Sequence, residues 1–145
     1  MRYFVDAEFN GFGGDLISLA AVPEDDAAPP FYEAIVCRDP CDWVTEHVLP
    51  VIQTKPRPMA EVARLFADFL SADLAPILIA DWPEDIAHAA TLLTNGKGGR
   101  LVNTEVAFRL LCQSEFSADK LSKYPHNAYY DALALRDWVL ASEAR

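Results

Sequence analysis

The feature that most restricts the fold of this chain is an apolar segment near its start that ends in two acidic residues. Residues 2–9 read RYFVDAEF and are apolar on both alternating faces, which is typical of a strand in the centre of a sheet. Asp6 and Glu8 interrupt the run while Ala7 and Phe9 continue it. Residues i and i+2 of a strand project to the same face, so both carboxylates are expected to point together from its carboxyl end.

The remaining apolar periodicity predicts an α/β fold with a mixed sheet of about five strands flanked by helices. Strands are expected at 16–22 and 31–36, each after a turn, so the first three strands form an antiparallel meander. A buried strand is expected at 75–81. Residues 100–106 either form a fifth strand or run into a helix over 107–112. The other expected helices cover 42–52, 58–73, 83–93 and 127–143.

The size and composition of the chain indicate one globular domain over residues 1–145. It is 52% hydrophobic and 23% charged, and it has no apolar run near the roughly 18–20 residues that a membrane-spanning helix needs. Its start carries no export-signal pattern, so we expect a cytoplasmic protein. The three cysteines, Cys37, Cys41 and Cys112, match no zinc site and are expected to be free, buried or half-buried thiols.

The net charge of −10 argues against a protein that coats nucleic acid through a general positive surface. It does not exclude an enzyme whose acids are neutralised by cations, because a metal ion inverts the local charge. Two ionised carboxylates side by side, such as Asp6 and Glu8, repel and lose hydration unless protons or hard cations such as Mg²⁺ or Mn²⁺ compensate. The alternative is that the strand ends at Val5 and both acids face water.

A calcium-binding loop is a competing interpretation of the sequence DAEFNG, which begins like the pattern D-x-[DN]-x-[DN]-G. That loop needs a glutamate at its twelfth position, which is Ile17 here, and an apolar strand begins where the loop would continue. The chain therefore does not fit a calcium loop.

Two further groups of titratable residues accompany the predicted elements. Asp81 ends its strand, where it is either a turn residue or part of a site, and Asp85 lies in the first turn of the next helix, where an acid also suits the helix dipole. Asp131 falls on the apolar face of the last helix, and an acid there needs a partner. His126, five residues earlier, is either a surface-loop histidine or a general base, since the unperturbed pKa of histidine is close to neutral.

Together, the order D-x-E, D and H-x(4)-D resembles the DEDDh group of 3′-to-5′ exonucleases in the ribonuclease H-like superfamily. FVDAEFNG (4–11) is similar to the first exonuclease motif and HNAYYDALAL (126–135) to the third, which is the more specific. The resemblance covers residues 3–139, and the short length and RYFVDAEF start resemble small bacterial exoribonucleases of the ribonuclease T-like branch. The middle motif departs from the family, because ADWPED stands where many members have a His-Asn-x-x-Phe-Asp kind of run.

The resemblance implies a ribonuclease H-like sheet and a phosphodiesterase that uses two ions of Mg²⁺ or Mn²⁺. The metal ligands that it implies are Asp6, Glu8, Asp85 and Asp131, with Asp81 as the alternate to Asp85. His126 would take the proton from the attacking water. The residues that it implies for binding the 3′-terminal nucleotide are Phe9, Asn10, Gly11 and Phe12.

We therefore expect a 3′-to-5′ exoribonuclease, and the acidic balance favours single-stranded or short RNA over long duplex. Two alternatives stay open. One is a DNA exonuclease of the same fold, which a preference for the 2′-hydroxyl would exclude. The other is a catalytically silent module that binds a partner protein through its acidic surface. A homodimer would supply basic surface that one chain lacks, and no membrane partner is expected.

Overall fold

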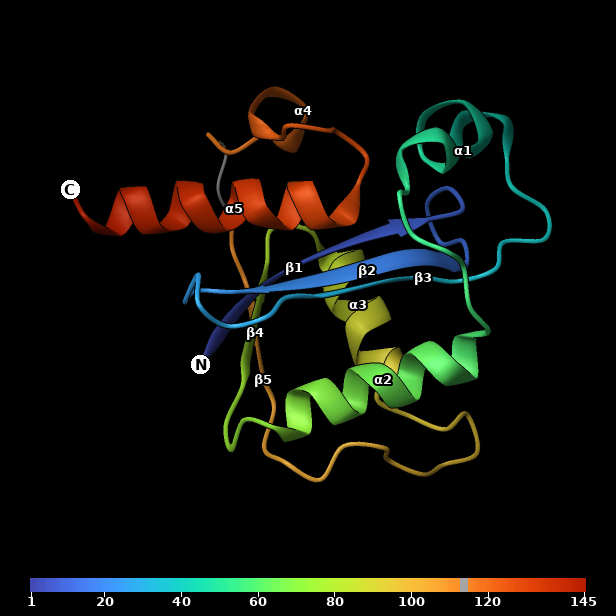
Figure 1. Ribbon diagram of the computed structural model, residues 1–145, viewed down its shortest axis with the longest axis horizontal. Helices are drawn as coiled ribbons and strands as arrows, with labels where there is room; N and C mark the ends of the chain where they lie inside the picture. The colour runs from blue at the N-terminus through green and yellow to red at the C-terminus, as the bar shows by residue number, and fades with distance from the viewer. Residues whose placement is uncertain (113–114) are drawn as a thin grey trace.

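A five-stranded mixed sheet with helices on both faces forms the computed structural model, which describes residues 1–112 and 115–145 (Figure 1). The strands are β1 (Arg2–Phe9), β2 (Leu16–Pro23), β3 (Phe31–Ala34), β4 (Ile77–Ala80) and β5 (Ala107–Leu110). Their spatial order is β3-β2-β1-β4-β5. The first three strands are antiparallel, and β4 and β5 run parallel to β1. The predicted α/β fold is confirmed, and its sheet order is consistent with a ribonuclease H-like fold.

Five α-helices of the described chain cover the two faces of the sheet. They are α1 (Asp42–His47), α2 (Met59–Ser71), α3 (Pro83–Leu92), α4 (Ala118–Leu121) and α5 (Ala128–Glu143). In Figure 1, α1, α4 and α5 lie above the sheet, and α2 and α3 lie below it. None of these helices is long and apolar enough to cross a membrane.

The alternation of β1 divides the core into two layers. Tyr3 and Val5 pack with the apolar stripe of α2 and with α3, whereas Phe4 packs on the opposite face against α5. Asp6 and Glu8 have the same parity as Phe4 and so lie on the α5 face. The prediction that both acids share one face of a central strand is confirmed, since β1 lies between β2 and β4.

Two predicted elements differ from the structure. The fifth strand is Ala107–Leu110 and not 100–106, so the alternative of a helix over 107–112 is wrong. Parallel pairing with β4 takes up the backbone groups of this segment and overrides its helix-like periodicity. The helix expected at 42–52 ends at His47 and continues as a short 3₁₀ helix, Leu49–Val51, because Pro50 lacks an N–H donor and its ring crowds the preceding turn.

The three cysteines are free, as predicted, but their burial is not as expected. Only Cys37 is half-buried, whereas Cys41 and Cys112 are exposed. Cys41 is the N-cap residue of α1, and Cys112 follows the edge strand β5. Side chains at a helix start and at a sheet edge have no packed layer over them, which explains their exposure.

Candidate metal centre

The sheet opens between β1 and β4 at their carboxyl ends. The two strands pair only from Arg2–Ile77 to Phe4–Ile79, so farther along β1 the backbone has no strand partner on that side. Asp85, in the first turn of α3, fills this gap: its Oδ1 accepts the N–H of Ala7 at 3.2 Å. A crevice beyond the carboxyl ends of diverging strands is where α/β sheets commonly bind ligands.

The predicted acids and the histidine meet in this crevice as two groups. Asp6, Asp81 and Asp85 form one group, and Glu8, His126 and Asp131 form the other. Within each group the ligand atoms lie within 4.8 Å of one another. All six residues line a single cavity of about 360 Å³. The two acids of β1 therefore serve different groups, and both Asp81 and Asp85 are brought into the cavity.

Three of these carboxylates are buried, and three carboxylate oxygens lack a partner. Asp85, Asp131 and Glu8 are 2%, 5% and 9% exposed. Within residues 1–112 and 115–145, Asp6 Oδ2, Asp85 Oδ2 and Asp131 Oδ1 are buried with no hydrogen-bond partner, and no lysine or arginine pairs with any of these carboxylates. Buried polar atoms are normally satisfied, so these three oxygens need a partner from outside the chain. A set of hard oxygen donors fits Mg²⁺ or Mn²⁺.

Burial raises the pKa of the five carboxyl groups that form the two groups, because the charged form loses its hydration. The pKa is raised to about 8 for Glu8 and for Asp85, and to about 6 for Asp131. It is raised well above the usual value for Asp6 and is also raised for Asp81. Repulsion between neighbouring carboxylates adds to burial for Asp6, Glu8 and Asp85. The metal-free cavity thus retains protons that a divalent cation would displace.

The approach to α5 orients Asp131. His126 adopts a left-handed backbone conformation, with φ of 67°, and its N–H donates to Asp131 Oδ2 at 3.0 Å. Asn127 caps the helix, since its Oδ1 accepts from the N–H groups of Tyr129 and Tyr130. The Nδ2 of Asn127 also donates to the carbonyl of Val51 at 2.6 Å. His126 and Asn127, the first two residues of HNAYYDALAL, therefore hold Asp131 in place through backbone hydrogen bonds.

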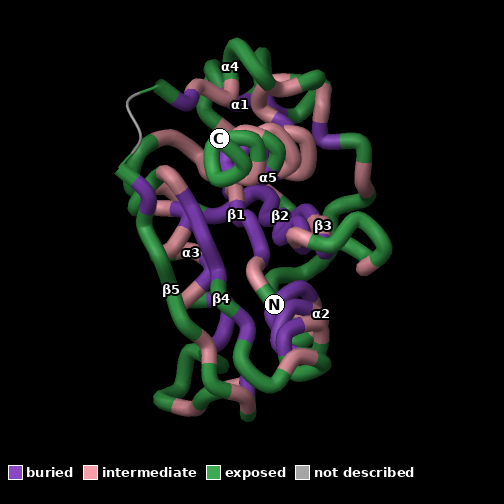
Figure 2. The backbone as a smooth tube through the Cα atoms, turned by 90° about the vertical axis from the view of Figure 1, so that its left-hand side faces the viewer, coloured by how far each residue is buried: buried purple, intermediate pink, exposed green. Residues whose placement is uncertain are grey.

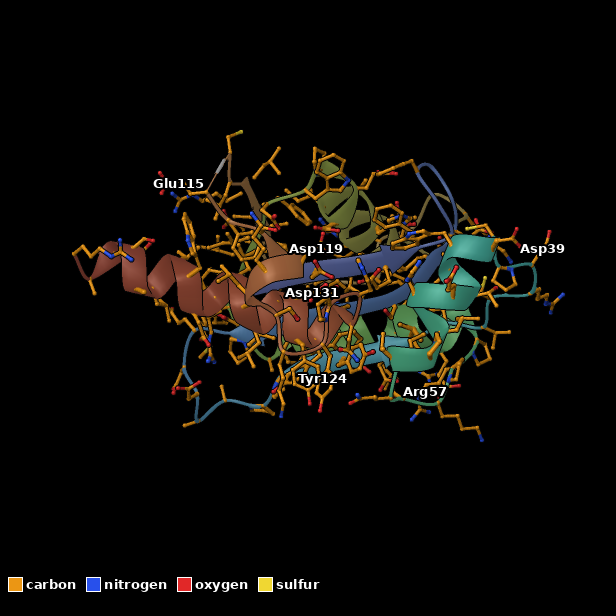
Figure 3. All side chains as sticks on the ribbon, turned by 90° about the horizontal axis from the view of Figure 1, so that it is seen from above. Asp39, Arg57, Glu115, Asp119, Tyr124 and Asp131 are labelled. Carbon is orange, nitrogen blue, oxygen red and sulfur yellow. The ribbon has the colours of Figure 1, made fainter. Side chains whose placement is uncertain are left out.

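The imidazole of His126 lies at the cavity wall between α1 and α4. Its Nε2 is 3.7 Å from Asp119 Oδ1, and its ring meets Trp43 edge-on with the ring centres 4.9 Å apart. Figure 3 shows Asp119 beside Asp131 above β1. Neither Asp119 nor Trp43 was identified from the sequence, because one lies on a single helical turn and the other on a short helix, each without a motif.

The loop after Glu8 forms the rim of the crevice. Phe12 is 86% exposed, and Gly11 takes a φ of +74° that glycine adopts freely. A second cavity, of about 380 Å³, lies between this loop and Trp43 and is also lined by Glu8 and Phe9. Trp82, missed by the sequence interpretation although it lies inside ADWPED, approaches Phe12 with ring centres 6.2 Å apart. Exposed aromatic rings thus border the acidic cavity.

Asn10 of the same loop has a structural contact. Its Nδ2 donates to the carbonyl of Asp39, and its Oδ1 accepts the N–H of Cys41, both at 2.8 Å. The amide therefore ties the start of α1 to the end of β1. This contact holds Trp43 near the cavity.

Comparison with known proteins does not assign this chain to a family. No protein-family model matches the chain, and no curated protein matches it.

Proposed function

We propose that the protein is a metal-dependent 3′-to-5′ exoribonuclease that hydrolyses phosphodiester bonds at the 3′ end of single-stranded or short RNA. The observation that carries this proposal is the cavity in which six carboxylates and His126 converge, with three buried oxygens unpartnered. The resemblance of the first and third motifs to DEDDh exonucleases, together with the five-stranded mixed sheet, supports the same activity.

The two groups of ligand atoms suit two divalent ions. Asp6 with Asp85 would hold one ion, with Asp81 as the alternate, and Glu8 with Asp131 would hold the other. When bound, Mg²⁺ or Mn²⁺ supplies a reactive water at neutral pH and stabilises the charge on the phosphate. The unpartnered oxygens of Asp6, Asp85 and Asp131 support this assignment, because each is buried and has no hydrogen-bond partner among the described residues.

His126 is the proposed general base. Its imidazole takes the proton from the attacking water, and the nearby carboxylate of Asp119 stabilises the imidazolium that results. Trp43 packs against the ring and restricts its orientation. The backbone N–H of His126 meanwhile keeps Asp131 aimed into the cavity, so one residue both orients a ligand and moves the proton.

Substrate binding is assigned to the rim. Phe9, Gly11 and Phe12 border the cavity of about 380 Å³ beside Glu8, and Asn10 fixes the opposite wall. Exposed aromatic rings stack on bases that are not paired, with little dependence on sequence. The acidic chain offers few contacts to a long phosphate backbone, which favours a 3′ end that enters the crevice by itself.

The test is a time course with a 5′-labelled single-stranded RNA and the DNA of the same sequence, with Mg²⁺, with Mn²⁺ and with a chelator. We expect RNA to shorten from the 3′ end with either metal, and no shortening with the chelator or in Asp131→Asn. Asp68→Asn, an exposed aspartate on α2, is the control that retains activity. Equal or faster shortening of DNA would reassign the substrate, and no shortening of any substrate would indicate a silent binding module.

A further inference from the structure

A cavity of about 560 Å³ lies between α2 and α3, on the face of the sheet opposite the acids of β1. Figure 1 shows both helices below the sheet, with the segment that follows α3 beneath them. The cavity is larger than the acidic one, which measures about 360 Å³, and its size is typical of the roughly 300–1,000 Å³ of small-molecule sites. The helical residues that line it lie one turn apart and so share one face of each helix: Ala60, Ala63 and Arg64 of α2, and His88, Thr91 and Leu92 of α3.

Small residues keep this cavity open. On α2 the lining includes Ala60 and Ala63, and the loop at 94–100, TNGKGGR, borders the cavity only through its threonine, asparagine and first glycine. Asn95 turns its amide towards this loop, since its Oδ1 accepts the N–H of Lys97 at 2.8 Å. In Figure 2 the loop, at the lower end of the molecule, is exposed over nearly its whole length. The loop therefore borders the cavity without filling it.

The inner wall of the cavity is apolar. Leu16 at the start of β2, Ala63 of α2 and Leu92 of α3 line it and are buried members of the core on this face. Leu101, which also lines the cavity, packs against the same core, and Met59 lines the cavity while it is 45% exposed. An apolar body of about the size of two fused rings would remove these surfaces from water, which is the main favourable contribution in such sites.

Arg64 gives this cavity a positive charge in a chain of net charge −10. Among the described residues that line the cavity, Arg64 is the one arginine or lysine, and none is acidic. Its exposed guanidinium makes no ion pair within residues 1–112 and 115–145, not even with Asp68 one turn farther along α2. A guanidinium without a carboxylate partner, beside an apolar wall, suits an anionic group on an apolar ligand.

His88 adds no second positive charge at neutral pH. Burial lowers the pKa of its imidazole, and the nearby carboxylates of Glu84 and Asp15, which do not line the cavity, offset only part of this shift. The ring stacks on Phe9 with the ring centres 5.2 Å apart, which restricts its orientation. The lining of the cavity therefore carries a single positive charge and matches a ligand with a single negative charge.

We propose that this cavity binds a small apolar carboxylate, with its hydrocarbon body against Leu16 and Leu92 and its carboxylate on the guanidinium of Arg64. A nucleotide would fit the cavity poorly, because its phosphate carries more negative charge than one arginine balances and its ribose would meet an apolar wall. The site lies on the opposite face of the sheet from the candidate metal centre, and the inference is independent of the proposed activity.

The first test is isothermal titration calorimetry of the full chain with 2-naphthoate and with its neutral isostere 2-naphthamide. We expect saturable binding of 2-naphthoate at a single site and about 3–10-fold weaker binding of 2-naphthamide. Arg64→Gln should weaken 2-naphthoate by the same factor and leave the affinity for 2-naphthamide unchanged. Lys97→Gln removes the same charge from the neighbouring loop at a residue that does not line the cavity, and this control should bind both probes as the wild type does.

The second test locates the bound probe by nuclear magnetic resonance of the wild type. 2-Naphthoate should shift the backbone amide resonances of α2, α3 and residues 94–101 and leave those of Asp6 and Glu8 in place. Ala60→Trp, at an exposed position that lines the cavity, should fill the space and abolish binding of both probes, with circular dichroism to check the fold. The proposal is overturned by a lack of saturable 2-naphthoate binding, by equal affinity for the two probes, or by resonance shifts confined to another part of the chain.

Discussion

Replacing Asp85 with asparagine should stabilise the metal-free protein at alkaline pH. The variant keeps the shape of the side chain, and its Oδ1 can still accept the N–H of Ala7, but it removes one buried charge. Burial raises the pKa of Asp85 to about 8, so the folded state binds more protons than the unfolded state. By linkage, stability must fall as the pH rises from the ordinary range of an aspartate towards about 8.

The structure gives the size of this effect. The difference between an ordinary pKa of 3.8 and one of about 8 corresponds to at most about 6 kcal/mol above pH 8. Asp6 and Glu8 bind protons in the same cavity, so their protonation already compensates for part of the charge of Asp85. We therefore expect one substitution to raise the free energy of unfolding by about 2 kcal/mol. For a chain of this length that is a rise of about 6 °C in the melting temperature.

Thermal unfolding followed by circular dichroism in chelator measures the gain. It should be largest above about pH 8, shrink as the pH is lowered, and vanish only below about pH 4, where the wild-type carboxyl becomes protonated in both states. Added Mg²⁺ or Mn²⁺ should raise the melting temperature of the wild type and of the control Asp68→Asn much more than that of the variant. A variant that melts below the wild type in chelator at pH 8, or that retains the full metal response, would refute the reasoning.

Four further predictions concern individual side chains. Asp85→Asn should abolish RNA shortening while Asp81→Asn retains some, and the reverse result would reassign the ligand. His126→Ala should lower kcat by about 10²–10⁴ and leave the metal-induced rise in melting temperature in place; loss of both would indicate a ligand instead of a base. Trp43→Ala should lower kcat/KM on single-stranded RNA by about one to two orders of magnitude, and an unchanged value would exclude stacking there. Asn127→Ala should cost about 1–2 kcal/mol in urea unfolding through loss of the α5 cap, and a neutral result would contradict that role.

The local parts of the site follow from the sequence because they depend on short-range geometry. The period of a strand places Asp6 and Glu8 on one face whatever they pack against, and the helical period places Asp131 on the buried face of α5. For these residues the sequence pattern and the structure agree, since neither depends on distant segments.

The parts that the sequence leaves open depend on long-range pairing. The segment 107–112 has an apolar pattern that suits a helix or a strand, and its pairing with β4, some 30 residues earlier, decides the outcome. Trp43 and Asp119 reach His126 only because α1 and α4 both lie above the sheet, and neither short helix carries a motif. Their role depends on the packing of segments far apart in the chain.

Asp85 and Asp131 are anchored in the same way, and this bears on whether Asp85 or Asp81 is the metal ligand. Asp85 accepts the N–H of Ala7 with Oδ1 and leaves Oδ2 unpartnered, and Asp131 accepts the N–H of His126 with Oδ2 and leaves Oδ1 unpartnered. Each is fixed by one oxygen and presents the other to the cavity. In the part of the chain that the structure describes, Asp81 has no such anchor from another residue. An anchored carboxylate loses less conformational entropy when it binds an ion, so this geometry supports the proposal that Asp85 is the ligand and Asp81 the alternate.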